Sequence, residues 1–237
     1  SDELDVSVDF LVQNADTDDG VSSLLEELSM PVFLFGLLYG YGRLKRFVTD
    51  PPWYSRSVSL DAVESLSSAE TVSCVPLPAD EFGNRLPESI VDRLGNLDVV
   101  VRFGFGILKG DALTAPEYGV LSYHHGDLRE YRGRPAGFYE FLHGVSSAGV
   151  TVQRLNEGLD SGEIASFERV GIDDAGSWPE VKDRLFSVSP SLLPPAVLAC
   201  VSESSHLEQP SELGDLYTNP SNGDVLRYVY RRITRSV

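Results

Sequence analysis

The sequence predicts an α/β domain built on a mostly parallel β-sheet. Short apolar runs with strand character alternate with segments of helical spacing through the middle of the chain, which is the pattern of βαβ units. The chain has 237 residues, of which 42% are hydrophobic and 23% are charged. This length and composition fit one large globular domain with a sizeable core, rather than a disordered chain.

The expected strands are apolar or alternating runs that end in polar or glycine-bearing loops. They comprise residues 6–12, 71–77, 97–104, 119–123, 149–155 and 164–170. Within 97–104 the run Val99–Val101 is continuously apolar, which is typical of a strand that is buried on both faces. Because the first recognisable element is already a strand, we expect that the chain lacks an upstream βα unit.

The expected helices are segments with apolar residues at helical spacing. They comprise residues 21–28, 59–66, 87–94, 135–143, 177–186 and 192–201. Pro135 and Gly144 bracket one of them, as is common for the two ends of a helix. Pro194-Pro195 is expected to begin the last helix as a separate element. The aromatic stretch 32–48 fits no single pattern.

The chain carries a formal net charge of −17, from 36 acidic and 19 basic residues. Such a surface repels phosphate backbones, so extended nucleic-acid binding is disfavoured. No apolar run reaches the roughly 18 residues that span a bilayer, and the acidic N-terminus does not resemble a secretory signal. Cys74 and Cys200 lie in apolar surroundings and are expected to be buried thiols. We therefore expect a cytoplasmic protein without a membrane partner.

The basic residues are mostly arginine, and only Lys45, Lys109 and Lys182 are lysines. An acid-rich, lysine-poor composition is found in proteins that stay soluble in concentrated salt, so we hypothesise a halophilic protein. Its stability and activity are expected to rise between dilute buffer and molar KCl, as measured by thermal denaturation and turnover. Full activity in dilute buffer would contradict the hypothesis.

The polar side chains with the clearest catalytic potential follow two of the expected strands. Ser122 and His124 lie at the end of the strand 119–123, and Asp160 lies in the glycine-bounded turn 158–162. Ionisable groups just past strand ends are the usual layout of an α/β active site. A histidine can move a proton near neutral pH, and a neighbouring carboxylate increases its basicity. The pattern therefore favours a His124–Asp160 pair.

Other interpretations of this region are open from the residues alone. His125 is expected to point away from His124, because successive side chains of a strand alternate between faces. His124, His125, Asp127 and Asp160 are metal-ligand types, but their spacing matches no known ligand motif, so we expect no metal.

Arg129 and Arg132 are of the type that binds an anionic substrate with two hydrogen bonds. They are also placed to pair with Asp127 and Glu130, and for Arg132 a role in loop structure is somewhat favoured. The Gly104-Phe-Gly106 sequence lacks the third glycine and the helix of a dinucleotide site, and no Gly-x-Ser-x-Gly nucleophile elbow occurs in the chain.

Three segments together resemble the formyltransferases that use 10-formyltetrahydrofolate, a family that includes methionyl-tRNA, phosphoribosylglycinamide and sugar N-formyltransferases. The segments are Ser122-Tyr-His-His-Gly-Asp-Leu-Arg-Glu-Tyr-Arg-Gly133, Gly149-Val-Thr-Val152 and Glu157-Gly-Leu-Asp-Ser-Gly-Glu-Ile164. The family pattern is Asn-x-His, Leu-Pro-x-x-Arg-Gly, Gly-Val-Thr and Asp-x-Gly-x-Ile. The spacing agrees, because Arg132 lies eight residues and Asp160 lies 36 residues after His124.

The resemblance implies a Rossmann-like three-layer domain of the formyltransferase type. Residues 1–205 would form the catalytic domain without its first βα unit, and residues 206–237 would form a C-terminal extension packed on the same domain. The family's general acid/base falls on His124, and the carboxylate that orients it falls on Asp160. The family's asparagine, whose amide donates to the developing oxyanion, is replaced here by Ser122.

The resemblance also implies where the two reactants bind. The pterin of 10-formyltetrahydrofolate would lie against the backbone of Gly106, Ile107 and Leu108, with Gly158 and Leu159 completing the donor site. The acceptor would contact Asp127, Arg129 and Arg132, in a branch whose His125-Gly-Asp-Leu-Arg129 differs from the more common Pro-Ser-Leu-Leu-Pro.

The acceptor implied by the resemblance is a primary amine. Only 77 residues follow Asp160 and the net charge is −17, both of which disfavour tRNA. A small-molecule amine, such as an amino sugar attached to a nucleotide, fits better. The alternatives are a methionyl-tRNA formyltransferase, a formyltetrahydrofolate hydrolase, and a folate-binding or regulatory protein without catalysis.

Overall fold

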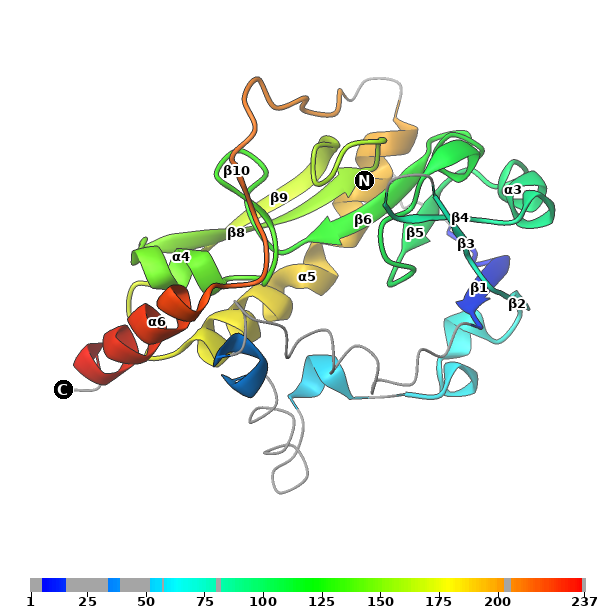
Figure 1. Ribbon diagram of the computed structural model, residues 1–237. Coiled ribbons are helices and arrows are strands. Elements are labelled where there is room, and N and C mark those ends of the chain that lie inside the picture. Colours follow the sequence, from blue (N-terminus) through cyan, green and yellow to red (C-terminus); the bar gives the residue numbers. More distant parts are fainter. Residues whose placement is uncertain are drawn as a thin grey trace.

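The computed structural model of the chain describes residues 6–15, 34–38, 52–56, 58–79, 82–202 and 206–235. Its centre is a four-stranded sheet (Figure 1) in the order β5, β6, β8, β9. These strands are β5 (Val100–Arg102), β6 (Val120–His124), β8 (Ser147–Arg154) and β9 (Glu163–Gly171). All four correspond to predicted strands, so the alternation of apolar and polar residues locates the sheet correctly.

The predicted parallel character of the sheet is wrong for most of this central sheet. Strands β5 and β6 are parallel, but β6 pairs antiparallel with β8, and β8 pairs antiparallel with β9. A short turn joins β8 to β9 and returns the chain directly alongside itself, which requires antiparallel pairing. The fold is therefore mixed α/β.

Six further strands form three two-stranded sheets. These pairs are β1 (Phe10–Asn14) with β2 (Glu70–Cys74), β10 (Asp215–Tyr217) with β7 (Tyr131–Gly133), and β3 (Leu77–Pro78) with β4 (Asn84–Arg85). The first two pairs are parallel and the third is antiparallel. The pairing of β10 with β7 brings the end of the chain against the loop that follows His124.

The helices of the described residues cover the sheet and its ends. They are α3 (Glu88–Leu94), α4 (Phe138–His143), α5 (Trp178–Val201), α6 (Asn222–Arg235) and the helical residues 34–38, with 3-10 turns η1 (Trp53–Ser55), η2 (Leu60–Ala62), η3 (Glu64–Leu66) and η4 (Gly110–Leu113). The predicted helices 87–94 and 135–143 are confirmed. The predicted helix 59–66 is instead two 3-10 turns, and the predicted helix 21–28 lies outside the described residues.

Helix α5 is one continuous helix of 24 residues, where two separate helices were expected. Pro190, Pro194 and Pro195 lie inside it, and all three are exposed. On the solvent side, the carbonyls that lose a helical partner to a proline can bond to water instead. Burial of the opposite face therefore outweighs the local preference of proline to begin a new helix.

Helix α5 is also long and apolar enough to cross a membrane by length and composition, contrary to the expectation that no such stretch exists. It packs across β8 and β9, and its residues Val181, Leu185 and Ala196 are completely buried there. A core helix of a globular domain can meet the same criterion, but only 17% of the apolar window of α5 is buried.

Strand β6 is buried on both faces and separates two apolar clusters. Val120 packs in the cluster formed with α3 and η4, whereas Leu121 packs in the cluster formed with α4, α5 and α6. Ser122 and His124 therefore share a face with Val120, and His125 shares the opposite face with Leu121. This alternation decides which polar side chains of β6 can meet.

Candidate active site

His124 is held at the end of β6 by contacts to both of its ring nitrogens. Its Nε2 lies 2.9 Å from the carbonyl oxygen of Tyr131, and its Nδ1 lies 3.5 Å from Oδ1 of Asp160. Because a carbonyl only accepts hydrogen bonds, Nε2 carries a hydrogen. Nδ1 is then the nitrogen that can take up or release a proton, and it faces the carboxylate.

Further hydrogen bonds hold Asp160 in position within the turn 158–162. Its Oδ2 accepts from the N–H of Gly133 at 2.9 Å, and its Oδ1 accepts from Nε2 of Gln153 at 3.3 Å. Its backbone has a φ of 43°, a left-handed conformation that aspartate tolerates better than most residues. The structure thus brings His124 and Asp160 together across 36 residues of sequence, as the strand-end pattern predicts.

Ser122 lies on the same face of β6 as His124 and contacts an arginine from the neighbouring strand. Its Oγ accepts hydrogen bonds from Nε and Nη2 of Arg102 at 3.2 and 2.9 Å. Arg102 also donates from Nη1 to the carbonyl of Gly106. Burial lowers the pKa of Arg102, and the charge of Asp160 opposes that shift. A half-buried guanidinium therefore lies beside Ser122.

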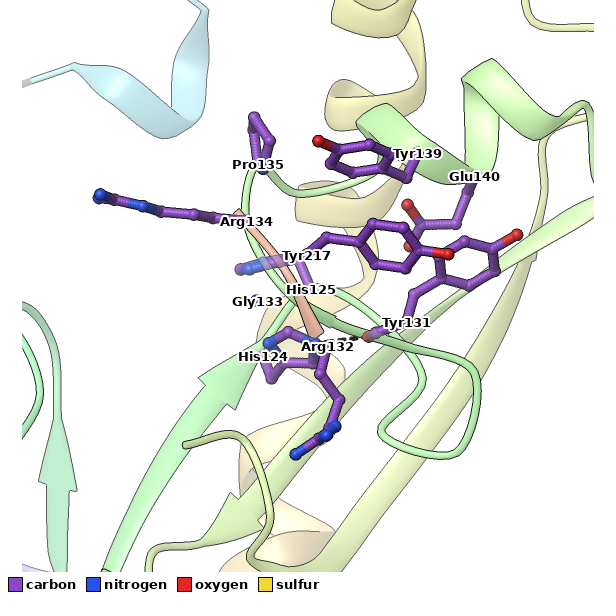
Figure 2. Close-up of a pocket in the computed structure, with 10 residues that line it drawn as sticks. All are labelled: His124, His125, Tyr131, Arg132, Gly133, Arg134, Pro135, Tyr139, Glu140 and Tyr217. Carbon is purple, nitrogen blue, oxygen red and sulfur yellow. Dashed lines mark hydrogen bonds between the residues drawn. The ribbon is translucent and has the colours of Figure 1, made fainter. Parts of the chain in front are cut away.

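A small pocket opens beside His124 (Figure 2). It is lined by residues from the end of β6, the segment after it, α4 and β10: His124, His125, Tyr131, Arg132, Gly133, Arg134, Pro135, Tyr139, Glu140 and Tyr217. Its cavity volume is about 10 Å³, which is roughly the space that one water needs. Its wall combines tyrosine rings with one buried carboxyl group.

The pKa values of the titratable groups in this pocket are shifted mainly by burial. Glu140 is 3% exposed, and burial raises its pKa to about 7, with the charge of Glu130 acting in the same direction. Burial likewise raises the pKa of Tyr131 to about 12 and that of Tyr139 to about 12. The charge of Glu140 contributes to the shift of Tyr131, which shows that the two groups are close.

His125 points to the other face of β6, as the alternation predicts. Its Nε2 lies 2.9 Å from Oγ of Ser189 on α5, and its ring stacks on Phe186 with the centroids 3.9 Å apart. Burial lowers its pKa to about 4, with smaller contributions from His124 and Lys182. A neutral, packed histidine of this kind anchors β6 to α5.

The structure does not bring Asp127 and Arg129 to the pocket, although both were predicted to contact substrate. Asp127 is 2% exposed, and its carboxylate accepts from Nε of Arg129 at 2.7 Å and from Nη2 of Arg169 at 2.7 Å. Arg129 also pairs with Glu208 at 2.9 Å. Both residues are thus engaged in an ion-pair cluster that joins the loop after β6 to β9, and substrate contact by Asp127 and Arg129 stays a prediction.

Arg132 lines the pocket, but its guanidinium is engaged by the backbone. Its Nε donates to the carbonyl of Gly214 at 2.8 Å, and its Nη1 donates to the carbonyl of Leu159 at 3.1 Å. It therefore ties the segment before β10 to the turn that carries Asp160. This geometry agrees with the loop role that the sequence somewhat favours, and substrate contact by Arg132 stays a prediction.

The two segments predicted to bind the pterin are tied to each other. Glu157 Oε1 accepts from the N–H of Gly110 at 2.9 Å, and Lys109 lies 3.6 Å from the same carboxylate. The carbonyl of Ile107 accepts from the N–H of Asn84 at 2.7 Å. Gly106 is exposed, Leu108 is buried and Gly158 is exposed. The backbones of residues 106–108 and 157–160 are thereby fixed relative to one another.

Within the described residues, no group of three or more His, Cys, Asp or Glu side chains is arranged to hold a metal ion. The four candidate ligands named from the sequence lie in three separate places. His124 and Asp160 face each other, His125 lies on the opposite face of β6, and Asp127 is enclosed by arginines.

The sequence reasoning missed three residues of this site: Arg102, Glu140 and Tyr217. Arg102 reaches Ser122 only because β5 pairs with β6 in parallel register, with these two residues as partners. Tyr217 reaches the pocket only through the pairing of β10 with β7. Glu140 had a local signal, since it is a lone carboxylate between the apolar Tyr139 and Phe141 of a short helix.

The sequence matches the family described as formyl transferase over residues 77–197, slightly more than half of the chain. A curated relative, the methionyl-tRNA formyltransferase of Ehrlichia ruminantium (strain Gardel), is 32% identical over 99 residues, which are 41% of this chain and 33% of the relative. The chain belongs to the formyl transferase family. It spans about a third of the length of the first curated relatives that it matches.

Two solved structures show the same fold. Glycinamide ribonucleotide transformylase 1 from Symbiobacterium toebii aligns with a TM-score of 0.51 and 22% identity, over 68% of this chain and 77% of the other. The N-formyltransferase from Helicobacter canadensis, solved with folinic acid and dTDP-3-aminofucose, aligns with a TM-score of 0.51 and 10% identity, over 95% and 81% of the two chains. The chain therefore has the mixed α/β formyltransferase fold.

Proposed function

We propose that this protein transfers a formyl group from 10-formyltetrahydrofolate to a primary amine. The observation that carries the proposal is the approach of His124 Nδ1 to Asp160 Oδ1, at 3.5 Å, in a chain of the formyl transferase family. His124 lies at the end of β6 and lines an open pocket, where a bound amine would reach it. We also propose that residues 1–205 form the catalytic domain and that residues 206–237 are an extension packed on it.

His124 is the general acid/base of the proposed reaction. In that reaction the acceptor nitrogen bonds to the formyl carbon, the bond from this carbon to the donor nitrogen breaks, and one proton moves from the acceptor nitrogen to the donor nitrogen. His124 Nδ1 accepts that proton and returns it. Asp160 holds the ring and stabilises its protonated form, and the Tyr131 carbonyl fixes the tautomer through Nε2.

Ser122 and Arg102 together take the place of the family's asparagine. The Arg102 guanidinium donates two hydrogen bonds to Ser122 Oγ. The serine hydroxyl itself donates to the carbonyl of Tyr123 at 3.4 Å, and in the proposed reaction this long hydrogen bond is exchanged for one to the formyl oxygen. As the formyl oxygen gains negative charge, a hydroxyl backed by a half-buried cation stabilises it better than a hydroxyl alone. This arrangement supports catalysis despite the substitution of asparagine.

The residues predicted to hold the folate donor suit a flat, polar heterocycle. Gly104 and Gly106 have positive φ values of 78° and 61°, and a side chain at Gly104 would meet nothing within 4 Å. The carbonyls of Gly106 and Ile107 already accept from Arg102 and Asn84. We therefore assign donor recognition to the N–H groups of residues 106–108 and to the turn at Gly158 and Leu159.

The acceptor proposed here is a small-molecule amine, for example an amino sugar attached to a nucleotide. The pocket beside His124 is small, and the net charge of −17 opposes a large polyanion. The relatives named above act on different acceptors, so they do not decide among tRNA, glycinamide ribonucleotide and sugar amines.

The function is tested by incubating purified protein with 10-formyltetrahydrofolate and three acceptor classes: dTDP-linked 3-amino sugars, glycinamide ribonucleotide and methionyl-tRNA. We expect formamide formation with a sugar amine. Formate release without any amine would show a hydrolase instead, and transfer to methionyl-tRNA alone would overturn the proposed acceptor. The absence of all turnover, with folinic acid still bound, would overturn catalysis.

Arg102 provides a separate prediction about the oxyanion. Arg102→Met is expected to lower kcat about 10²–10³-fold, the usual effect of losing one oxyanion donor, while Arg102→Lys retains part of the activity through its charge. Arg93→Met is the matched control, because Arg93 pairs with the exposed Glu70 far from the pocket. Steady-state kinetics of the three variants give the answer, and an unchanged kcat in Arg102→Met would remove this residue from the mechanism.

The second candidate function is folate binding without catalysis, and the serine at position 122 is the observation that favours it. A hydroxyl is shorter than an amide and reaches less far toward the formyl oxygen. If wild-type protein binds folinic acid without turnover and Ser122→Asn restores formyl transfer, the second candidate is the better one. If Ser122→Asn leaves an active enzyme no faster, the Arg102-supported serine is sufficient.

A further inference from the structure

Glu140 is a buried carboxylate that the proposed reaction does not use. It is 3% exposed and lines the pocket beside His124. Within the described part of the chain, the hydrogen bond to its carboxylate comes from its own backbone N–H. A buried carboxylate without a cation or a set of strong donors is costly, so such groups are usually paired.

The polar groups nearest to Glu140 are committed elsewhere. The Tyr131 hydroxyl lies 3.1 Å from Nδ1 of His143, and the Tyr139 hydroxyl donates to the carbonyl of Thr218 at 3.1 Å. Figure 2 shows the Glu140 carboxylate beside the rings of Tyr131 and Tyr217. Its charge contributes to the raised pKa of both tyrosines.

The two arginines that line the pocket do not neutralise Glu140. Arg132 is engaged by the carbonyls of Gly214 and Leu159. Arg134 is exposed, and its side chain points away from the carboxylate in Figure 2. The pocket therefore presents one carboxylate beside three tyrosine rings, and the carboxylate attracts a cation through its charge.

We propose that the pocket formed by Tyr131, Tyr139, Glu140 and Tyr217 is an ammonium subsite, in which Glu140 binds the acceptor's primary amine in its protonated form beside His124. The ammonium passes one proton to the Glu140 carboxylate and becomes the neutral amine that attacks the formyl carbon. The second proton of the acceptor nitrogen then moves through His124 to the donor nitrogen. This assignment rests on the proposed formyl transfer, because only that reaction explains why an amine should enter here. The space of about 10 Å³ suits one ammonium group, which is the size of a water.

The rings themselves show why an ammonium group fits better than a sugar ring. Tyr217 stacks between Tyr139, at 4.2 Å, and Tyr131, at 5.5 Å between centroids. Both faces of the Tyr217 ring are thus covered, and no open platform is left on it for a sugar to stack. Because Tyr217 comes from β10, the subsite is complete only when the C-terminal segment pairs with β7.

The subsite is tested by direct binding, which needs neither the formyl donor nor turnover. Ligand-observed NMR at pH 8 and constant ionic strength compares n-propylammonium with its neutral isostere n-propanol. We expect wild-type protein to bind n-propylammonium at least tenfold more tightly than n-propanol, and Glu140→Gln to lose this preference. Glu117→Gln is the matched control, since Glu117 is exposed and is expected to leave the preference unchanged.

Two outcomes overturn the proposal: equal affinities for the two probes in wild-type protein, or an unchanged preference in Glu140→Gln. Glu140→Gln keeps the shape and the hydrogen-bond acceptor of the side chain, so it is expected to fold, and circular dichroism verifies this. If the protein shows no formyl transfer but binds n-propylammonium preferentially, the ammonium subsite is supported and the proposed reaction is wrong. If the protein transfers the formyl group but shows no preference for n-propylammonium, the reaction is supported and the ammonium subsite is wrong.

Discussion

Replacing His124 by Ala is expected to lower kcat for formyl transfer about 10²–10⁴-fold, the usual range for the loss of a general acid/base. The affinity for folinic acid is expected to change little, because the predicted donor site uses residues 106–108 and the turn at 158–159. Rapid-quench or steady-state measurement of formamide formation, together with thermal stabilisation by folinic acid, separates these two effects. A variant that keeps full turnover would show that the mechanism is wrong.

Two further variants test whether the expected loss of activity is specific to His124 and its carboxylate partner. His206→Ala is the matched control, since His206 is exposed in the segment after α5 and is expected to leave kcat unchanged. Asp160→Asn keeps the φ of 43° at that position, because asparagine tolerates the left-handed conformation. It removes the negative charge that faces Nδ1 of His124 and replaces one of the two acceptor oxygens, which bond to Gly133 and Gln153, by an NH2 group. Its kcat is expected to lie between those of wild type and His124→Ala.

The proximity of His124 and Asp160 could be predicted from the sequence because its signal is local. Ser122 and His124 end an apolar strand, and Asp160 sits in a turn bounded by Gly158 and Gly162. Each motif determines its own backbone conformation, and the sheet then brings the two together. The strands themselves were predictable for the same reason, since alternation of apolar and polar residues depends on nearest neighbours.

The direction of the strands and the course of α5 could not be predicted by local rules. Whether β8 runs parallel or antiparallel to β6 depends on the connection between them, which contains the three-residue β7 and the six-residue α4. The prolines of α5 signal a helix start locally, but one buried face from Val181 to Cys200 holds the helix together. In both cases a tertiary contact outweighs the preference of a short segment.

The pocket wall escaped prediction because it is assembled from distant segments. Tyr217 pairs with Gly133 across 84 residues of sequence, and a propensity argument has no access to such a pairing. The ion pair of Arg129 with Glu208 could not be predicted by local rules either, and substrate contact by Arg129 stays a prediction. Its partners Asp127 and Glu208 belong to three-dimensional neighbours that neutralise it.

Glu140→Gln is expected to be more stable than wild-type protein at pH 8, by up to about 3 kcal/mol. The pKa of Glu140 is raised from 4.5 to about 7 in the folded protein, so the folded state binds the proton more tightly than the unfolded state. Between these two pKa values the free energy of unfolding of the wild type falls as the pH rises. Above both values the folded protein carries the full free-energy cost of burying the ionised Glu140 carboxylate. At about 1.4 kcal/mol for each pKa unit, the difference corresponds to about 3 kcal/mol.

Urea denaturation at pH 4.5 and at pH 8 measures this effect. The glutamine is neutral at both values, so the difference between variant and wild type is expected to be small at pH 4.5 and large at pH 8. The neighbouring titratable groups Glu130, Tyr131, His143 and Tyr217 are common to both proteins and cancel in this difference. A constant difference at the two pH values would show that Glu140 titrates like an exposed carboxylate.

The same measurement connects the stability of the fold to the ammonium subsite. A ligand that binds only the folded state adds stability in proportion to the logarithm of its saturation. At pH 8 n-propylammonium is therefore expected to stabilise the wild type and to leave Glu140→Gln unchanged. If it stabilises both proteins equally, the carboxylate is buried without a partner and the pocket has no preference for a cation.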